Sequence, residues 1–263
     1  MIRELFHIGS ISISPFGVAL VAAFAVAFFQ LRAGMKRLGI GSEDDASAIL
    51  FSAGLGGIIG GKVYYAALHG DWKLLFDRSG LVWYGGFLLA SVLVMLTMRR
   101  RRLSFWPMMD AATVALAVGY GVGRIGCFLV GDDYGMPTHL PWGVTFPVGL
   151  PPTTAGELRA FGAEVPPDLP PDALVAVHPT QLYETALALG IWLVGRSMLK
   201  RRLPAGTTAS VMLALLALER FGIEFLRAKD DRFFGPFTLA QLISLGILLV
   251  VGLAFWRRRA ARA

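Results

Sequence analysis

The sequence predicts an all-α membrane protein whose chain crosses the bilayer about seven times. Of its 263 residues, 55% are hydrophobic and only 16% are charged, whereas a soluble domain carries about 25% charged residues. Apolar runs of about 20 residues, long enough to cross a hydrocarbon core of about 30 Å, recur along the chain. They cover residues 14–31, 47–68, 83–98, 107–130, 179–198, 206–227 and 236–256. We therefore expect one polytopic membrane domain over residues 1–263.

The net charge of +7 does not indicate a nucleic-acid partner, because the basic residues follow the pattern of a membrane protein. They gather at every second membrane boundary, in residues 32–37, 99–102, 196–202 and 257–262. Lysine and arginine are enriched on the cytoplasmic side of membrane proteins. The pattern predicts a cytoplasmic C-terminus and, with seven spans, an N-terminus on the outside. Anchoring to anionic lipid headgroups is the role that we expect for these clusters.

The connection over residues 131–177, on the external side, is much longer than the others. It contains nine prolines and one basic residue. Tyr134, Trp142 and Phe146 in its first half suit the membrane interface. Because so long a connection is usually functional or disordered, we expect an external loop whose second half, residues 151–174, is a mobile arm.

Charged side chains inside the apolar runs are the main functional signal. An ionisable residue in a membrane costs at least about 2.5 kcal/mol, so each one needs a partner or a function. Arg124, Glu184, Arg220 and Glu224 fall at comparable depth, in the outer half of their runs. Unrelated structural ion pairs have no reason to share a depth. These residues therefore predict one polar site that faces the outside.

Arg124 lies in a glycine-rich stretch that allows a ligand or another backbone to approach closely. The glycines are at positions 119, 121, 123, 126 and 131. A guanidinium here suits a bidentate anion, such as the phosphate diester of a lipid headgroup. The alternative, a buried ion pair with a carboxylate on another helix, stays open. Cys127, the single cysteine, excludes an intramolecular disulfide and is by default a buried structural thiol.

Two further stretches place polar residues on one helix face. Gln181 shares a face with both His178 and Glu184 at the start of the fifth run, although His178 also suits a hydrogen-bonding role at the interface. In the sixth run, Arg220, Glu224 and Arg227 share a face, which is equally compatible with a self-satisfied ladder of ion pairs. Tyr84, at the start of the third run, precedes a Gly-Gly pair that allows a ligand against the backbone.

In this order, these stretches resemble blocks of the prolipoprotein diacylglyceryl transferases of bacteria. The stretch Gly-Arg-Ile-Gly-Cys-Phe that begins at Gly123 is similar to the start of that family's signature segment. The similar blocks are residues 123–138, 178–184 and 220–227, with looser matches at 60–62 and 84–86. Three separated blocks in the right order are far more specific than a single short pattern.

The resemblance implies an enzyme of the bacterial inner membrane, with a periplasmic N-terminus and a cytoplasmic C-terminus. Such an enzyme transfers the diacylglyceryl group of phosphatidylglycerol to the lipobox cysteine of a preprolipoprotein signal peptide and releases glycerol-1-phosphate. The implied partners are phosphatidylglycerol, that signal peptide and membrane lipids, and neither a metal nor a cofactor is implied.

The resemblance also implies roles for individual residues. Arg124 would bind the lipid phosphate, and Arg220 would stabilise the phosphate as it leaves. Glu184 and Glu224 would orient these guanidiniums or help to manage the thiol proton, and Gly135 would shape the external lip. Tyr84 completes the implied catalytic group, and the remaining implied contacts of phosphatidylglycerol are Gly126, Cys127, His178, Gln181 and Arg227. Preorganised positive charge acts mostly on the transition state, in which the charge on the leaving phosphate grows.

Four positions depart from the family pattern. Tyr84 stands where histidine is usual, Cys127 where asparagine is usual, Phe16 where tyrosine is usual, and Lys62 where arginine is commoner. A phenol with a reference pKa of about 10 is a poor general base at neutral pH, but it could orient a headgroup or relay a proton. A covalent intermediate on Cys127 is not expected, because only Arg124 is near enough in sequence to lower its pKa.

Two other functions stay open. One is a relative of the transferases that keeps the lipid cavity but uses a different acceptor or none, which the changes at Tyr84 and Cys127 motivate. The other is a lipid transporter or flippase. A transporter predicts inverted repeats and broken helices at the midplane, whereas this sequence shows no repeat and its buried charges lie toward one side.

Overall fold

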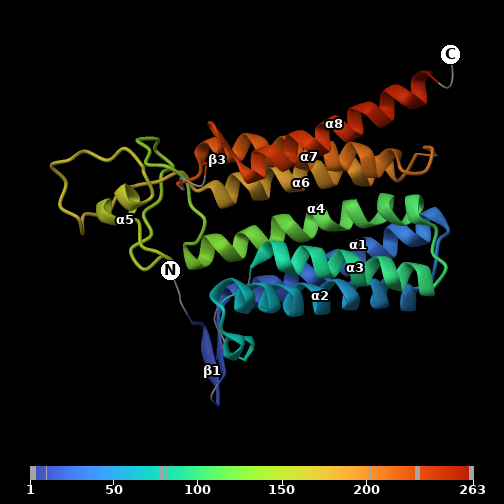
Figure 1. Ribbon diagram of the computed structural model, residues 1–263, viewed down its shortest axis with the longest axis horizontal. Coiled ribbons are helices and arrows are strands. Elements are labelled where there is room, and N and C mark those ends of the chain that lie inside the picture. Colours follow the sequence, from blue (N-terminus) through green and yellow to red (C-terminus); the bar gives the residue numbers. More distant parts are fainter. Residues whose placement is uncertain are drawn as a thin grey trace.

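The computed structural model describes residues 4–9, 11–76, 80, 82–201, 203–228 and 232–260. Arg202 and Arg262 of the predicted basic clusters lie outside the described residues. Seven long helices form the body of the described chain (Figure 1), and each coincides with one predicted apolar run. They are α1 Pro15–Leu38, α2 Glu43–His69, α3 Trp83–Arg100, α4 Phe105–Val130, α6 Thr180–Met198, α7 Thr207–Ile223 and α8 Leu239–Ala260.

The prediction of a helical, polytopic membrane protein is confirmed. Among the described helices, four are long and apolar enough to cross a membrane by length and composition alone. These are α1, α2, α4 and the Leu239–Arg257 part of α8. The count of seven spans stays a prediction.

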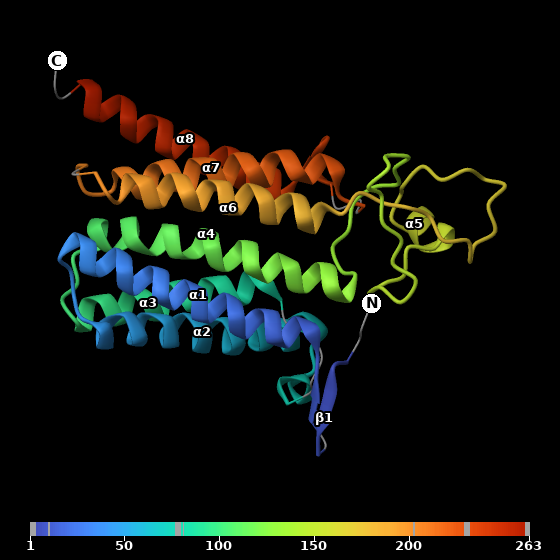
Figure 2. The ribbon, with the colours of Figure 1, turned by 180° about the vertical axis from the view of Figure 1, so that it is seen from behind.

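Several short elements lie outside these seven helices. They are the hairpin β1 Phe6–Ile8 with β2 Ile11–Ile13, the 3-10 turns Trp72–Leu75 and Glu224–Leu226, the helix α5 Ala155–Ala160, and the pair β3 Arg232–Phe234 with β4 Phe237–Thr238. Seen from behind in Figure 2, the β1–β2 hairpin projects from the same end of the bundle as α5.

Side-chain caps fix where the helices begin. Ser42 accepts a hydrogen bond from the amide of Asp45 at 3.2 Å, and Asp45 accepts one from the amide of Ser42 at 2.8 Å. This reciprocal pair satisfies amides that the first turn of α2 leaves free. Asp110, buried in α4, accepts hydrogen bonds from the amides of Gly206 and Ala209, each at 2.7 Å. This buried carboxylate, which the sequence analysis did not single out, therefore caps the start of α7.

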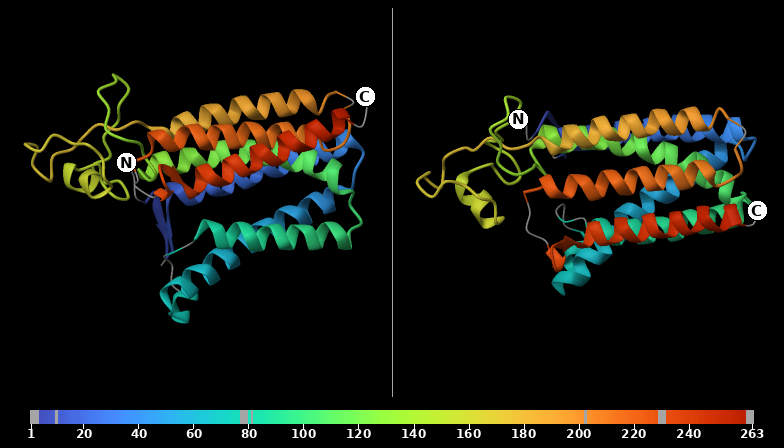
Figure 3. Two further views of the ribbon diagram at one scale, coloured as in Figure 1. Left: turned by 45° about the horizontal axis from the view of Figure 1, so that its top comes forward. Right: turned by 90° about the horizontal axis from the view of Figure 1, so that it is seen from above.

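Helix α4 lies at the centre of the bundle and packs against α1, α6 and α7, while α2 pairs with α3, and α8 with α7. Figure 3 shows the α2–α3 pair set apart from the layer of α6, α7 and α8. The backbones of α2 and α3 touch: a Cβ on Gly60 would lie 2.2 Å from the Gly85 oxygen, and one on Gly86 would lie 2.7 Å from the Gly57 oxygen. The Gly-Gly pair was expected to expose backbone to a ligand, but it serves helix packing.

The two ends of the bundle differ in composition. The connections α1–α2, α3–α4 and α6–α7 and the end of α8 lie together at one end, which we call the basic end because the basic clusters fall there. Residues 131–177 lie at the opposite end, which we call the arm end (Figure 1). The alternation of basic and non-basic boundaries in the sequence therefore corresponds to two opposite ends of the structure.

The segment expected to be a mobile arm, residues 151–174, has internal structure. Leu158 of α5 is fully buried, and Arg159 donates to the carbonyl oxygens of Pro166 at 2.6 Å and Leu169 at 2.9 Å. The buried cluster consists of Tyr134, Phe146, Leu158, Ala163, Val177 and Ala228. This local core could not be recognised in the Pro-rich sequence, since the apolar residues of the core are far apart along the chain.

Candidate active site at the arm end

Three arginines and three carboxylates form a continuous chain of ion pairs at the arm end, which we call the ionic array. In order along the chain of contacts, its members are Glu184, Arg124, Asp133, Arg227, Glu224 and Arg220. They come from α4, from the loop after it, from α6, from the end of α7 and from the turn that follows. All four residues that the sequence placed at one depth are therefore members of one cluster.

Arg124 lies at the buried end of the array. It forms an ion pair with Glu184 of α6, and its Nη1 lies 3.0 Å from Oδ2 of Asp133. The Tyr120 hydroxyl donates to Oε1 of Glu184 at 2.9 Å. Only 8% of Arg124 and 1% of Glu184 are exposed. Of the two possibilities left open for Arg124, the structure shows the buried ion pair.

Arg220 lies at the accessible end of the array. Its Nη2 is 2.6 Å from Oε2 of Glu224, and 30% of its side chain is exposed. The same Glu224 oxygen lies 3.6 Å from Nη1 of Arg227, and Nη2 of Arg227 lies 2.5 Å from Oδ1 of Asp133. The expected ion pairs among Arg220, Glu224 and Arg227 are therefore present, but not along one helix face, because α7 ends at Ile223 and a 3-10 turn follows. Asp133 connects these pairs to Arg124.

Asp133 is the central residue of the array, and the sequence analysis missed its role. It has a left-handed backbone conformation with φ of +58°. The Thr180 hydroxyl donates to the Asp133 carbonyl at 2.9 Å, and the Gln181 side chain donates to the Asp132 carbonyl at 2.6 Å. The start of α6 therefore holds this loop in place. The signal in the sequence was an acidic pair directly after the glycine-rich stretch.

The two neighbouring aspartates have opposite electrostatic environments. Burial alone would raise the pKa of Asp133, but the guanidiniums of Arg227 and Arg124 outweigh it and hold that pKa below its usual value. Burial and the charge of Asp133 together raise the pKa of Asp132 above its usual value. Of the two aspartates, Asp133 is therefore the one whose ionised form the array stabilises.

Glu219 is a further buried carboxylate near the array. Glu219 of α7 is 7% exposed, and its Oε1 has no hydrogen-bond partner among the described residues. The carboxyl group of Glu219 interacts electrostatically with Glu184, Arg220 and Arg124. The sequence signal was an acidic residue directly before Arg220 within an apolar run.

Comparison with known proteins identifies the family of this chain. The family model for prolipoprotein diacylglyceryl transferase matches residues 3–257. The chain belongs to this family.

Curated members of the family align with nearly the whole chain. It is 28% identical to the phosphatidylglycerol–prolipoprotein diacylglyceryl transferase of Geobacter sulfurreducens, over 93% of this chain and 90% of the relative. It is 31% identical to the protein of that name from Solidesulfovibrio magneticus, over 96% and 92% respectively, and 30% identical to that from Xylella fastidiosa strain 9a5c, over 95% and 90%. This diacylglyceryl transferase family and the apolar helices together identify a multi-pass membrane protein.

His178 and Gly135, both expected to contact lipid, lie beside the array of this family member. The Gly135 amide donates to the His178 carbonyl at 2.9 Å, and a Cβ on Gly135 would lie 2.6 Å from the Leu226 oxygen. The His178 ring lies 3.3 Å from the Tyr183 hydroxyl, which accepts a hydrogen bond from Trp142 at 2.7 Å. Gly135 therefore permits close backbone packing at the rim, and His178 belongs to an aromatic hydrogen-bond network.

The glycine-rich stretch serves helix packing more than it exposes backbone. A Cβ on Gly126 would lie 2.7 Å from the Ala19 Cβ, so α1 covers this glycine, which was expected to contact lipid. A Cβ on Gly123 would meet no atom within 4 Å. Cys127 lies beside the array, with its sulfur 3.5 Å from Nη1 of Arg124.

Tyr84 is the expected catalytic residue that the structure does not join to the array. It lies in the first turn of α3, which packs on α2, and its ring contacts the Trp83 ring edge-to-face with a 5.4 Å centroid separation. Within the described ranges, its hydroxyl forms no hydrogen bond with any member of the array. Nothing in this arrangement assigns Tyr84 a place at the reacting atoms.

Proposed function

We propose that this chain is a phosphatidylglycerol–prolipoprotein diacylglyceryl transferase of the bacterial inner membrane. It transfers the diacylglyceryl group of phosphatidylglycerol to the lipobox cysteine of a preprolipoprotein signal peptide and releases glycerol-1-phosphate. The observation that carries the proposal is the ionic array, in which buried arginines from different elements converge at one end of a membrane bundle of this family.

The lipid phosphate binds by competing with the carboxylates of the array. Arg220 is the most exposed of its guanidiniums, so the phosphate meets it first and displaces Glu224. Arginine suits this exchange because its planar fork matches carboxylate and phosphate oxygens equally well. Glu184 stays paired with Arg124 and holds that guanidinium in place. The array is therefore preorganised for an anion before the lipid arrives.

The displaced carboxylate then supports the transfer step. The thiol proton of the lipobox cysteine passes to Glu224, and the sulfur attacks the carbon of the diacylated glycerol that is bonded to the phosphate oxygen. The carbon–oxygen bond breaks, its electron pair stays on the phosphate oxygen, and Arg220 stabilises the growing charge. The proton on Glu224 finally passes to the departing glycerol-1-phosphate, which restores the Arg220–Glu224 pair.

The arm end faces the periplasm in this proposal, and the basic end faces the cytoplasm. The positive-inside rule supports this orientation, because the basic clusters lie at one end and the array lies at the other. The lipobox cysteine of an exported precursor would approach the array from the outer leaflet.

Complementation of a bacterial strain depleted of its own transferase tests the proposal. The wild-type chain should restore growth, and Arg220→Ala should not. Arg32→Ala is the matched control, because it removes an arginine from an exposed ion pair with Glu43 at the basic end. If the wild-type chain is inserted and stable but supports no growth and lipidates no lipobox peptide, the relative with another acceptor replaces this proposal.

A further inference from the structure

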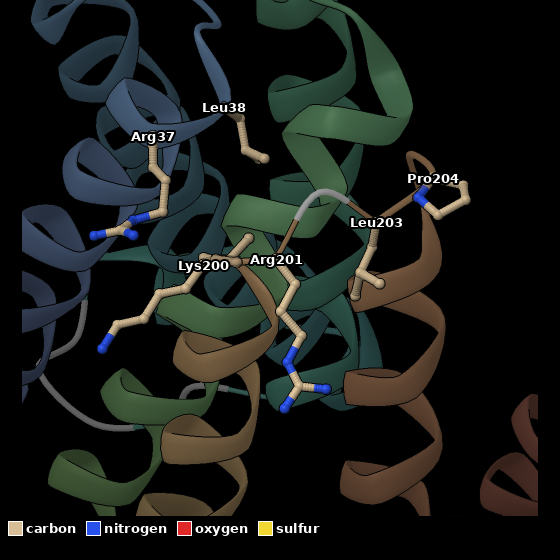
Figure 4. A pocket seen from close by; sticks show the side chains of 7 residues that line it. Arg37, Leu38, Lys200, Arg201, Leu203 and Pro204 are labelled. Atoms are coloured by element: carbon tan, nitrogen blue, oxygen red, sulfur yellow. The ribbon is translucent and has the colours of Figure 1, made fainter.

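A cavity of about 640 Å³ opens at the basic end, far from the ionic array (Figure 4). Its wall comes from the end of α1 and from the α6–α7 connection, and includes Arg37, Lys200 and Arg201. In Figure 4 the Arg37 and Lys200 side chains extend toward the same side, although they come from segments far apart in the sequence. The fold therefore gathers basic residues from two separate clusters around one hollow.

Among the described residues, the basic side chains that line this cavity differ from Arg32 and Arg101 at the same end, because no carboxylate pairs with them. Arg32 pairs with Glu43 at 2.7 Å, and Arg101 pairs with Asp45 at 2.8 Å. Over the ranges that the structure describes, no carboxylate lies within 4.0 Å of the cationic groups that line the cavity. Those groups are on Arg37, Lys200 and Arg201. Their charge is available to an anion from outside the chain.

An apolar groove continues from this cavity toward the middle of the bundle. A second cavity of about 270 Å³ shares Arg37 and Leu199 with the first and runs along α1 to Val26. At 1.5 Å per helical residue, the distance from Arg37 to Val26 is about 16 Å. Its α1 side includes Phe29, which is 62% exposed. The groove therefore has the length and the apolar surface to hold much of one acyl chain.

The opposite wall of the groove is held in a defined position. The Trp192 indole donates to the Gln30 side chain at 2.9 Å, and the Arg196 guanidinium lies 5.3 Å from the centre of the same ring. Both α1 and α6 pack on α4, but they do not form one of the major helix pairs with each other. A groove between two helices that share a neighbour is a natural position for a lipid chain.

We propose that this groove binds one anionic glycerophospholipid from the leaflet at the basic end. Its phosphate lies at Arg37 and Lys200, and one acyl chain lies between α1 and α6. Anchoring to headgroups in general accounts for a basic cluster at a membrane boundary. It does not account for two clusters that converge on a hollow continuous with an apolar groove. A zwitterionic lipid fits less well, because its own cation faces the guanidinium.

Photo-crosslinking in lipid nanodiscs tests this site. The probes are phosphatidylglycerol and phosphatidylcholine, each with a diazirine near the end of one acyl chain, and the labelled peptides are located by mass spectrometry. Phosphatidylglycerol should label residues 26–37 and 192–201 about tenfold more strongly than phosphatidylcholine. Equal labelling by the two probes would show a non-specific apolar surface and overturn the proposal.

Charge-matched variants identify the residues responsible. Arg37→Gln/Lys200→Gln/Arg201→Gln should lower labelling of the groove by phosphatidylglycerol about tenfold. Lys36→Gln/Arg99→Gln/Arg100→Gln removes three charges from the same end without touching the cavity, and should keep the labelling. Arg37→Lys/Arg201→Lys keeps the charge and should also keep it. Equal losses in the two glutamine triples would overturn the assignment, as would displacement of the lipid probe by inorganic phosphate.

Discussion

The arm end and the basic end of the bundle are both rich in arginine, yet they hold it in opposite ways. At the arm end Arg124 is 8% exposed and contacts two carboxylates. At the basic end Arg37 is exposed and has no acidic partner in the described part of the chain. The arm-end arginines are dispersed in sequence and united by the fold, whereas those of the basic end occur in runs.

This difference follows from the cost of removing charge from water. A buried guanidinium needs carboxylates with good geometry, and the pair then interacts strongly because little water screens it. An exposed guanidinium needs no partner and contributes little to stability. Burial and acidic partners, rather than the number of arginines, therefore distinguish the proposed reaction site from a surface that holds lipid.

Loss of a carboxylate from the arm end should have the largest effect on stability. Glu184→Gln leaves the buried Arg124 guanidinium without its main partner, and should lower the free energy of unfolding by about 3–5 kcal/mol. Glu43→Gln, which breaks the exposed pair with Arg32, should lower it by at most about 1 kcal/mol. Thermal melting in detergent micelles measures both. Equal shifts of the melting temperature in Glu184→Gln and Glu43→Gln would contradict the burial of the Arg124–Glu184 pair.

Replacement of Asp110 tests whether this buried carboxylate near the basic end has a structural role. Asp110→Ala leaves the amides of Gly206 and Ala209 without their acceptor, and should lower the free energy of unfolding by about 1–3 kcal/mol. The rate of diacylglyceryl transfer per folded molecule should stay unchanged at low temperature. A specific loss of transfer activity would contradict the division of roles between the two ends.

Asp133 and Asp132 should respond to pH in opposite ways. A lowered pKa in the folded state gives Asp133 a stabilising contribution that is present above about pH 4, near the unfolded value, and is lost as the pH falls through the folded value. Asp133→Asn should therefore lower the melting temperature at neutral pH and weaken its fall on acidification. The raised pKa of Asp132 makes its ionised form unfavourable, so Asp132→Asn should keep or raise the melting temperature at neutral pH. Falls of equal size in the two variants would contradict the assigned shifts.

Removal of the Tyr84 hydroxyl should have the smallest effect, a small change in the rate of transfer. Loss of a general base typically costs about 10²–10⁴ in rate, whereas a phenol without a hydrogen bond to the array should cost less than tenfold when removed. Tyr84→Phe therefore should keep most of the transfer rate, measured with saturating lipobox peptide. A loss of a hundredfold or more would return Tyr84 to the reacting atoms and make the array incomplete without it.

Much of the fold and part of the site could be predicted from the sequence. The helices were predictable because each of the seven long helices coincides with an apolar run of the sequence. Arg124, Glu184, Arg220 and Glu224 stood out because a charge within an apolar run is costly. Asp133 did not stand out, since a carboxylate in a loop is ordinary in a sequence. Only the fold places it between two arginines.

The glycines show a second limit of sequence patterns. A glycine indicates a close approach but does not say what approaches. At Gly126 the neighbour is α1, and at Gly85 and Gly86 it is α2. The local core of the Pro-rich arm could not be predicted for a related reason, because Leu158 and Phe146 come together only once the segment has turned back on itself.

Transfer measured with purified components tests the central claim most directly. Wild-type protein in nanodiscs that contain phosphatidylglycerol labelled in its acyl chains should move the label to the cysteine of a lipobox peptide. Arg220→Ala should slow this transfer, measured per folded molecule, by about 10²–10³-fold, because it removes charge stabilisation from the transition state. Arg32→Ala should transfer at the wild-type rate. Transfer by Arg220→Ala at the rate of Arg32→Ala would contradict the claim that the ionic array is where the phosphate departs.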